Sequence, residues 1–189
     1  MRKISAIMLL LAMLCGCAAL AETAEKEYIA TVDANGVFEL RCALPEGYQI
    51  TEGVSEDPSY RTFRIEGEKD KPYMTLSIAF DEMYADTERL NDLDSEEKNA
   101  LLATFSAEDI VESSITKTDF GTELITVRET DGETDYVVFF TIYKGYEIEF
   151  VLNAPVPEND GDAAAGLTDA QIQMAVRFLS DLDFIPETP

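Results

Sequence analysis

Three consecutive predicted strands between residues 121 and 152 constrain the fold more than any other stretch of the chain. Residues 123–129 follow the two-residue period of a strand, and Asp131-Gly132 then supplies the two positive-φ residues that a tight hairpin turn requires. Residues 135–143 are apolar on both faces and rich in aromatic and β-branched side chains, which is typical of a central strand covered on both sides. Residues 146–152 alternate again. The pattern therefore predicts a three-stranded antiparallel meander.

Other segments with a two-residue period are predicted to extend this sheet. A hairpin is expected from residues 28–32 and 37–43. Further strands are expected at residues 60–66 and 73–80 because side chains alternate there with a two-residue period. Residues 113–118 are expected to form a strand that leads into the meander.

Two later segments have the period of a helix. Ser95 is expected to cap a helix over residues 95–105, and residues 106–112 are expected to add one more helical turn. Thr168 and Gln171 form a capping box that starts a second helix. Because each helix has an apolar stripe that must be buried, the expected fold class is α+β: a single antiparallel β-sheet with helices packed on its faces. The stripe of the second helix comprises Ile172, Ala175, Val176, Leu179 and Leu182.

The N-terminal residues have the pattern of an export signal. Arg2 and Lys3 precede an apolar run over residues 4–14 that is too short to span a bilayer. A signal peptide over residues 1–21 would release a secreted chain. Alternatively, residues 1–16 form a lipoprotein signal and Cys17 carries the lipid. Both alternatives predict an extracytoplasmic protein, either secreted or lipid-anchored to the outer face of the cell membrane.

The amino-acid composition excludes several kinds of chemistry. The chain has no histidine, so it cannot carry a Ser-His-Asp or Cys-His catalytic group or a histidine-based metal site. After cleavage at residue 21, Cys42 is the only cysteine, and a lone cysteine cannot form an internal disulfide. Cys42 shares the apolar face of its strand and is expected to be a buried hydrophobic residue.

The charge is strongly acidic and bears on the choice of partner. There are 14 Lys and Arg residues against 38 Asp and Glu residues, a net charge of −24, and loss of Arg2 and Lys3 with the signal makes it −26. Such a surface repels nucleic acid and anionic lipid headgroups. A protein partner is expected, with no nucleic acid and no membrane contact other than a lipid at Cys17.

The order of elements is similar to that of the PsbP-like family, an α/β/α-sandwich superfamily. The resemblance rests on the alternating run from Phe38 to Tyr48, on Gly145-Tyr146-x-Ile148-x-Phe150 and on Leu182-Asp183-Phe184. It implies one PsbP-like domain over residues 36–185, preceded by a lead segment and first strand over residues 22–35. Family members bind other proteins or assist large complexes, and the family brings no catalytic residues.

These observations predict a non-catalytic extracytoplasmic binding or accessory domain, with no cofactor. The alternatives are a carboxylate-based hydrolase, for which no pair of acids stands out, and a cation-binding acidic module. The weak candidates for metal ligands are Glu158, Asp160 and Asp162, which lie in one acidic loop without the ligand spacing of an EF-hand. No metal site is therefore expected.

The charge leads to a first prediction about stability. Because like charges are brought together on folding, the melting temperature should rise with modest NaCl, which screens charges over about 10 Å at 0.1 M. Calcium, magnesium and NaCl of matched ionic strength should act alike in melting curves. A rise that only calcium produces, and that Asp160→Asn with Asp162→Asn removes, would contradict this expectation and identify a cation site.

Overall fold

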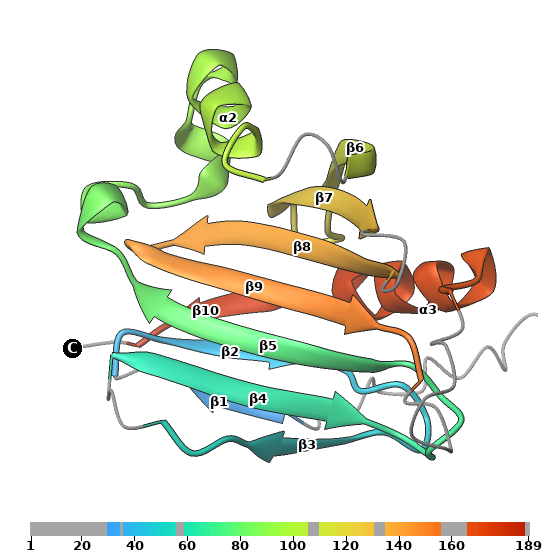
Figure 1. Cartoon of the computed structure of the whole chain (residues 1–189). Helices are drawn as coiled ribbons and strands as arrows, with labels where there is room; N and C mark the ends of the chain where they lie inside the picture. Colours follow the sequence, from blue (N-terminus) through green and yellow to red (C-terminus); the bar gives the residue numbers. More distant parts are fainter. Residues whose placement is uncertain are drawn as a thin grey trace, which may run out of the picture.

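The computed structural model describes residues 30–34, 36–55, 59–105, 110–130, 135–155 and 166–187. Its main element is a seven-stranded sheet in which all neighbouring strands are antiparallel (Figure 1). The strand order is β3 (Gln49–Glu52), β4 (Tyr60–Glu66), β5 (Tyr73–Phe80), β9 (Tyr146–Asn153), β8 (Asp135–Tyr143), β7 (Glu123–Thr130) and β6 (Ile110–Lys117).

The meander predicted from the sequence is confirmed as β7, β8 and β9. Strand β8 lies between the other two and is almost wholly buried, as its two apolar faces indicate. The turn into β9 uses Lys144 at φ 51° and Gly145 at φ 79°, both in the left-handed region that a tight hairpin turn needs. The expected Asp131-Gly132 turn lies outside the described residues.

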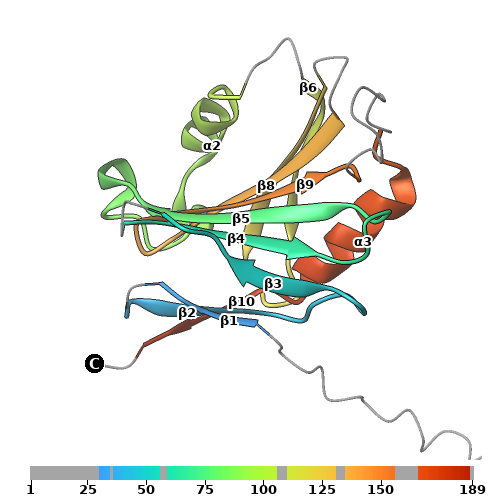
Figure 2. The ribbon, with the colours of Figure 1, turned by 60° about the horizontal axis from the view of Figure 1, so that its bottom comes forward.

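A second sheet of three strands packs against one face of the large sheet (Figure 2). Its central strand is β2 (Phe38–Cys42), which pairs with β1 (Ala30–Asp33) and β10 (Asp183–Pro186). The Phe38 ring lies 5.0 Å from that of Tyr143 on the large sheet, in an edge-to-face contact. The predicted hairpin of the first two strands is confirmed.

The prediction of one sheet with helices on its faces, as in the α/β/α sandwich, is wrong. The molecule is mostly β, and the strands of the first hairpin form a separate layer instead of extending the large sheet. The sequence could not show this because alternation identifies strands and their apolar face but not their pairing partners. Phe38, Leu40 and Cys42 point into the space between the sheets and are fully buried there.

Helix α3 (Asp169–Ser180) covers the rest of the face on which the small sheet packs. Thr168 caps it through the predicted capping box with Gln171. Ala175, Phe178 and Leu179 are buried, and the Phe178 ring lies 6.2 Å from that of Phe150 on β9. The apolar stripe is therefore buried against the sheet, as the sequence predicted.

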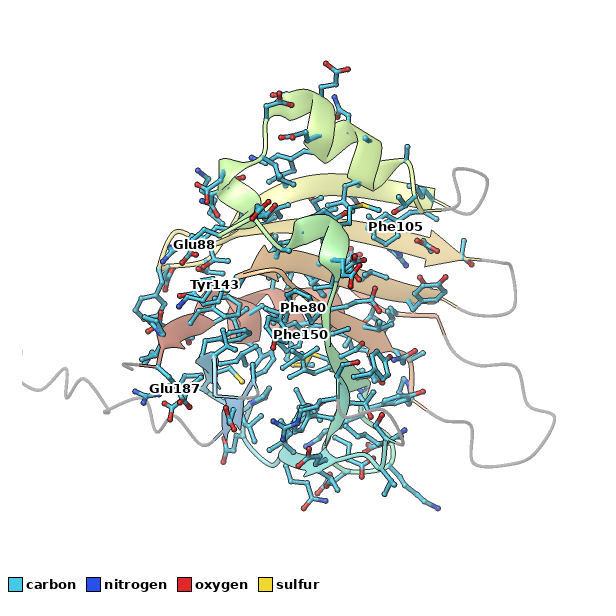
Figure 3. The ribbon with its side chains drawn as sticks, turned by 90° about the vertical axis from the view of Figure 1, so that its left-hand side faces the viewer. Phe80, Glu88, Phe105, Tyr143, Phe150 and Glu187 are labelled. Atoms are coloured by element: carbon cyan, nitrogen blue, oxygen red, sulfur yellow. The ribbon has the colours of Figure 1, made fainter. Side chains whose placement is uncertain are left out.

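The opposite face carries shorter helical segments over β7 and β8. These are the 3₁₀ turns η1 (Glu82–Tyr84) and η2 (Leu90–Asp92) and helix α2 (Ser95–Leu102). Figure 3 labels Phe105 on this side and Phe150 among the side chains that pack toward the small sheet. None of the helices described in the structure is long and apolar enough to cross a membrane.

The limits of the α2 region differ from the prediction in three respects. Asp94, not Ser95, caps the helix, because its carboxylate accepts hydrogen bonds from the backbone N–H groups of Glu96 and Glu97. The helix ends at Leu102. Residues 110–112, expected to be helical, belong to strand β6, and residues 106–109 lie outside the described part of the chain.

Candidate functional site

Strand β6 forms one edge of the large sheet and is the most exposed of its longer strands. It pairs with β7 on one side, and no other strand of the described residues pairs with it. Its residues 111–115 are all exposed, including the apolar side chains of Val111 (58% exposed) and Ile115 (52%). A β-bulge between Ile110 and Glu112 interrupts the register at its start.

Ion pairs on Glu123 fasten this edge to helix α2. The Glu123 carboxylate lies 2.7 Å from the Lys98 ammonium on α2 and 3.1 Å from that of Lys117 at the end of β6. The hydrogen bond from Lys98 lowers the pKa of Glu123, with a smaller contribution from Lys117. Glu123 therefore stays ionised and holds strand and helix together.

A groove of about 380 Å3, the β6–α3 groove, separates the edge strand from helix α3. Glu112, Ser114 and Thr116 of β6 lie on one side of it. Ile172 and Val176 of α3 supply an apolar patch on the other. The groove thus combines hydroxyl groups, a carboxylate and a limited apolar surface.

One charged network joins the large sheet to the start of α3 at this groove. Arg128 on β7 donates two hydrogen bonds to Asp135 on β8, at 3.0 and 2.8 Å, and one to the Leu167 carbonyl at 3.2 Å. Asp135 in turn accepts the Leu167 N–H at 2.8 Å. The bond from Arg128 lowers the pKa of Asp135, and the bond to Asp135 raises the pKa of Arg128.

Replacing Arg128 by methionine should lower the free energy of unfolding at pH 7 by about 2 kcal/mol, because charged hydrogen bonds in a partly buried site are lost. The pKa of Asp135 is lower in the folded chain than in the unfolded chain, so this stabilisation is present above the unfolded pKa and is lost as pH falls through the folded value. Urea titrations should therefore show that the difference in the free energy of unfolding between the unchanged chain and Arg128→Met becomes smaller at acid pH.

The matched control is Lys71→Met, which removes an exposed ion pair with Glu68 and should cost less than about 1 kcal/mol. A deficit in Arg128→Met that is independent of pH would contradict the role assigned to the Asp135 carboxylate.

A second polar feature, the carboxylate cluster of Glu129, Glu147 and Glu149, lies on the α2 side of the large sheet. Glu129 is buried and accepts a hydrogen bond of 2.6 Å from the Tyr136 hydroxyl. Burial raises the pKa of Glu147, helped by the charges of Asp81 and Glu149, and burial with the charge of Glu129 raises the pKa of Glu149. No cation in the described part of the chain pairs with Glu147 or Glu149.

Replacing Glu149 by glutamine should raise the melting temperature at pH 7 by up to about 4 °C, the shift that 1 kcal/mol produces in a domain of this size. Because the pKa of Glu149 is raised in the folded chain, its ionisation destabilises the fold as pH rises past the unfolded pKa. The gain should therefore vanish below about pH 4, where the carboxyl is protonated in both states.

The control for this prediction is Glu46→Gln, on an exposed turn after β2, which should change the melting temperature little at any pH. Melting curves of both variants between pH 3.5 and 8 make the measurement. A gain from Glu149→Gln that is as large at pH 3.5 as at pH 7 would contradict the explanation by burial.

Of the candidate site residues singled out from the sequence, the structure describes only Cys42. Glu158, Asp160, Asp162 and the lipidation candidate Cys17 lie outside the described residues. Cys42 is fully buried, as expected, and burial raises the pKa of its thiol to about 12. A thiol with this pKa is almost wholly protonated at neutral pH and is a poor nucleophile.

Sequence reasoning missed both the β6–α3 groove and the carboxylate cluster. Residues 113–118 were expected to form a strand, but nothing in their pattern shows that the strand lies at an edge. The alternation of Glu147 and Glu149 with apolar residues placed them on one face, yet their burial depends on segments folded over that face from elsewhere in the chain.

No family model matches this chain, and no curated protein matches it. The resemblance to the PsbP-like family therefore stays a prediction.

Proposed function

We propose that this protein is a non-catalytic binding or accessory domain that acts outside the cytoplasm and docks a protein partner. One observation carries the proposal: an eight-residue edge strand exposes apolar side chains beside a groove of mixed polarity. Exposed edge strands with apolar residues are sites of association because their outer backbone groups can pair with another chain.

The other edge of the large sheet provides a comparison. Strand β3 has only four residues, Gln49–Glu52, and such short edges give little backbone for a partner to pair with. Strand β6 is twice as long, and Val111 and Ile115 remain exposed on it. The contrast supports docking at β6.

The proposal is tested with purified proteins encoded beside this gene, because an accessory domain is often encoded next to its partner. A partner should bind the intact chain more weakly after Ile115→Asp. The control is Val54→Asp, which changes an equally apolar and more exposed side chain on the loop after β3. Equal loss in both variants would contradict docking at β6, and the absence of binding to any of these proteins would count against the function itself.

Export is part of this proposal, in either of its two forms. Mass spectrometry of the mature chain separates them: a free N-terminus at Glu22 identifies the secreted form, and a lipid on Cys17 identifies the anchored form. A chain that retains residues 1–21 would contradict the extracytoplasmic location.

A second candidate function is a carboxylate-based hydrolase, which the raised pKa values of Glu147 and Glu149 favour. Such an enzyme needs one protonated and one ionised carboxyl group at working pH. Both pKa values are shifted in the same direction, so the two environments do not separate an acid from a base, and we rank this function second. Hydrolysis of a glycoside or ester panel that Glu147→Gln and Glu149→Gln each abolish would reverse the ranking.

A further inference from the structure

We propose that the partner inserts an extended basic segment as an eighth strand along β6, with its Lys or Arg side chains over the β6–α3 groove and its apolar side chains beside Ile115. The inference rests on the proposed function, since it specifies how the protein partner binds. Three features support it: the outer edge of β6, with which no other described strand pairs, the alternation of its side chains and the charge of the groove.

The backbone of β6 sets the length and conformation of the segment. In an antiparallel sheet an edge strand directs every second pair of N–H and C=O groups outward. Eight residues at about 3.4 Å each span about 27 Å, which is the upper limit on the length of strand that a partner can pair with. The bulge between Ile110 and Glu112 disturbs pairing at the first residues and leaves the regular stretch from Ser113 to Lys117 for the partner.

The two faces of β6 differ and set the pattern of the segment. Ser114 lies opposite Thr126 and lines the groove with Glu112 and Thr116. Ile115 lies opposite Ile125, whose side chain is buried in the core beneath α2. Residues paired directly across an antiparallel ladder share a face, so the partner alternates between residues that meet hydroxyl and carboxylate groups and residues that meet Ile115.

The charge of the groove determines which polar residues the partner uses. The Arg128 guanidinium is already paired with Asp135. Glu112 and Asp169 both lie close enough to Arg128 to affect its pKa, and within the described ranges neither forms an ion pair of its own. The groove therefore holds two uncompensated carboxylates, which favours Lys or Arg on a segment lying above it.

The same charge argues against a second copy of this chain as the occupant. Each copy carries a net charge of −24, so two copies brought edge to edge repel one another. A partner segment with several basic residues gains attraction from the same field. The occupant is therefore a basic segment of a different protein.

The experiment is disulfide capture on the full chain carrying Cys15→Ser and Cys17→Ser. Cys42 stays in place because its buried thiol does not react. A reporter cysteine is placed at Ser114 on β6, or, as matched controls, at Thr51 on the short edge strand β3 and at exposed Glu96 on α2. The probes are synthetic nine-residue peptides with a central activated cysteine, in which lysine alternates with valine.

Three further peptides each test one part of the inference. A peptide with glutamate in place of lysine tests the charge, and a peptide of the same composition with lysines and valines in separate blocks tests the alternation. A lysine peptide that is N-methylated on alternate amides tests the backbone pairing. The alternating lysine peptide is expected to react with Ser114→Cys at least tenfold faster than each of these three. At Thr51→Cys and Glu96→Cys, the alternating, block and N-methylated lysine peptides should react at similar rates.

Equal rates for the lysine peptides at all three positions would show attraction by net charge alone and would overturn strand addition. A glutamate peptide that reacts with Ser114→Cys as fast as the lysine peptide would overturn the basic specificity. Amide hydrogen exchange provides a second measurement on the chain without a reporter cysteine. A saturating concentration of the alternating lysine peptide should slow exchange in β6, and the N-methylated peptide should not. Equal protection by both peptides would also overturn strand addition. These failures leave the proposed function standing if a neighbour-encoded partner still binds the intact chain, and that function fails separately if none binds.

Discussion

Replacing Phe139 by alanine is expected to lower the free energy of unfolding by about 3–5 kcal/mol. Phe139 lies on the central strand β8, is 1% exposed, and faces Phe150 across the β8–β9 ladder. Removing its ring would lose buried apolar area and leave a cavity between the large sheet and the layer beneath it.

The control for Phe139→Ala is Phe80→Ala, at the exposed end of β5, where the ring is 45% exposed. Apart from the loss of the edge-to-face contact between the Phe80 and Tyr146 rings, this change should lower the free energy of unfolding by less than about 1 kcal/mol. Guanidinium titrations of both variants give the comparison. A loss below about 1 kcal/mol for Phe139→Ala would mean that β8 is not a central buried strand.

Replacing Phe38 by alanine should cost a similar 3–5 kcal/mol, and this variant tests the packing of the small sheet. The Phe38 side chain is fully buried, and its ring contacts those of Tyr143 at 5.0 Å and Tyr146 at 5.5 Å on the large sheet. It also contacts Phe184 on β10 at 5.8 Å. One ring thus links both sheets, so its removal weakens the interface as well as the small sheet.

Tyr60→Ala is the matched control, because this aromatic residue lies on β4 with 42% of its surface exposed. Chemical unfolding followed by circular dichroism should show a much smaller loss for it. A loss below about 1 kcal/mol for Phe38→Ala would contradict packing of the small sheet on the large one.

Single strands and helix ends could be predicted from the sequence because they depend on the pattern of apolar side chains and on hydrogen bonds between residues close in the chain. Strand β8 is apolar on both faces, and the capping box at Thr168 starts α3 where the pattern indicated. The prediction of Ser95 as the cap of α2 was wrong by one residue, because the preceding Asp94 has the extended backbone of a cap and its carboxylate accepts the hydrogen bonds.

The assignment of strands to sheets could not be predicted in the same way. Strand β2 has the alternation that an extension of the large sheet would also have, and only its contacts with distant residues such as Tyr143 put it in a second layer. The candidate site depends on the same kind of information. Ile115 is exposed because β6 is last in the strand order, and the pKa of Glu149 is raised by burial among segments far apart in the sequence.

The small sheet is built from both ends of the described chain, and this affects when the protein can finish folding. Its central strand β2 comes from the first third of the sequence, while β10 comes from its last residues, with Phe38 directly opposite Pro186. A ribosome must therefore synthesise the chain through Pro186 before β2 gains its second partner. Until then Phe38 and Leu40 lack part of their cover, so the nascent protein exposes apolar surface that folding helpers can recognise.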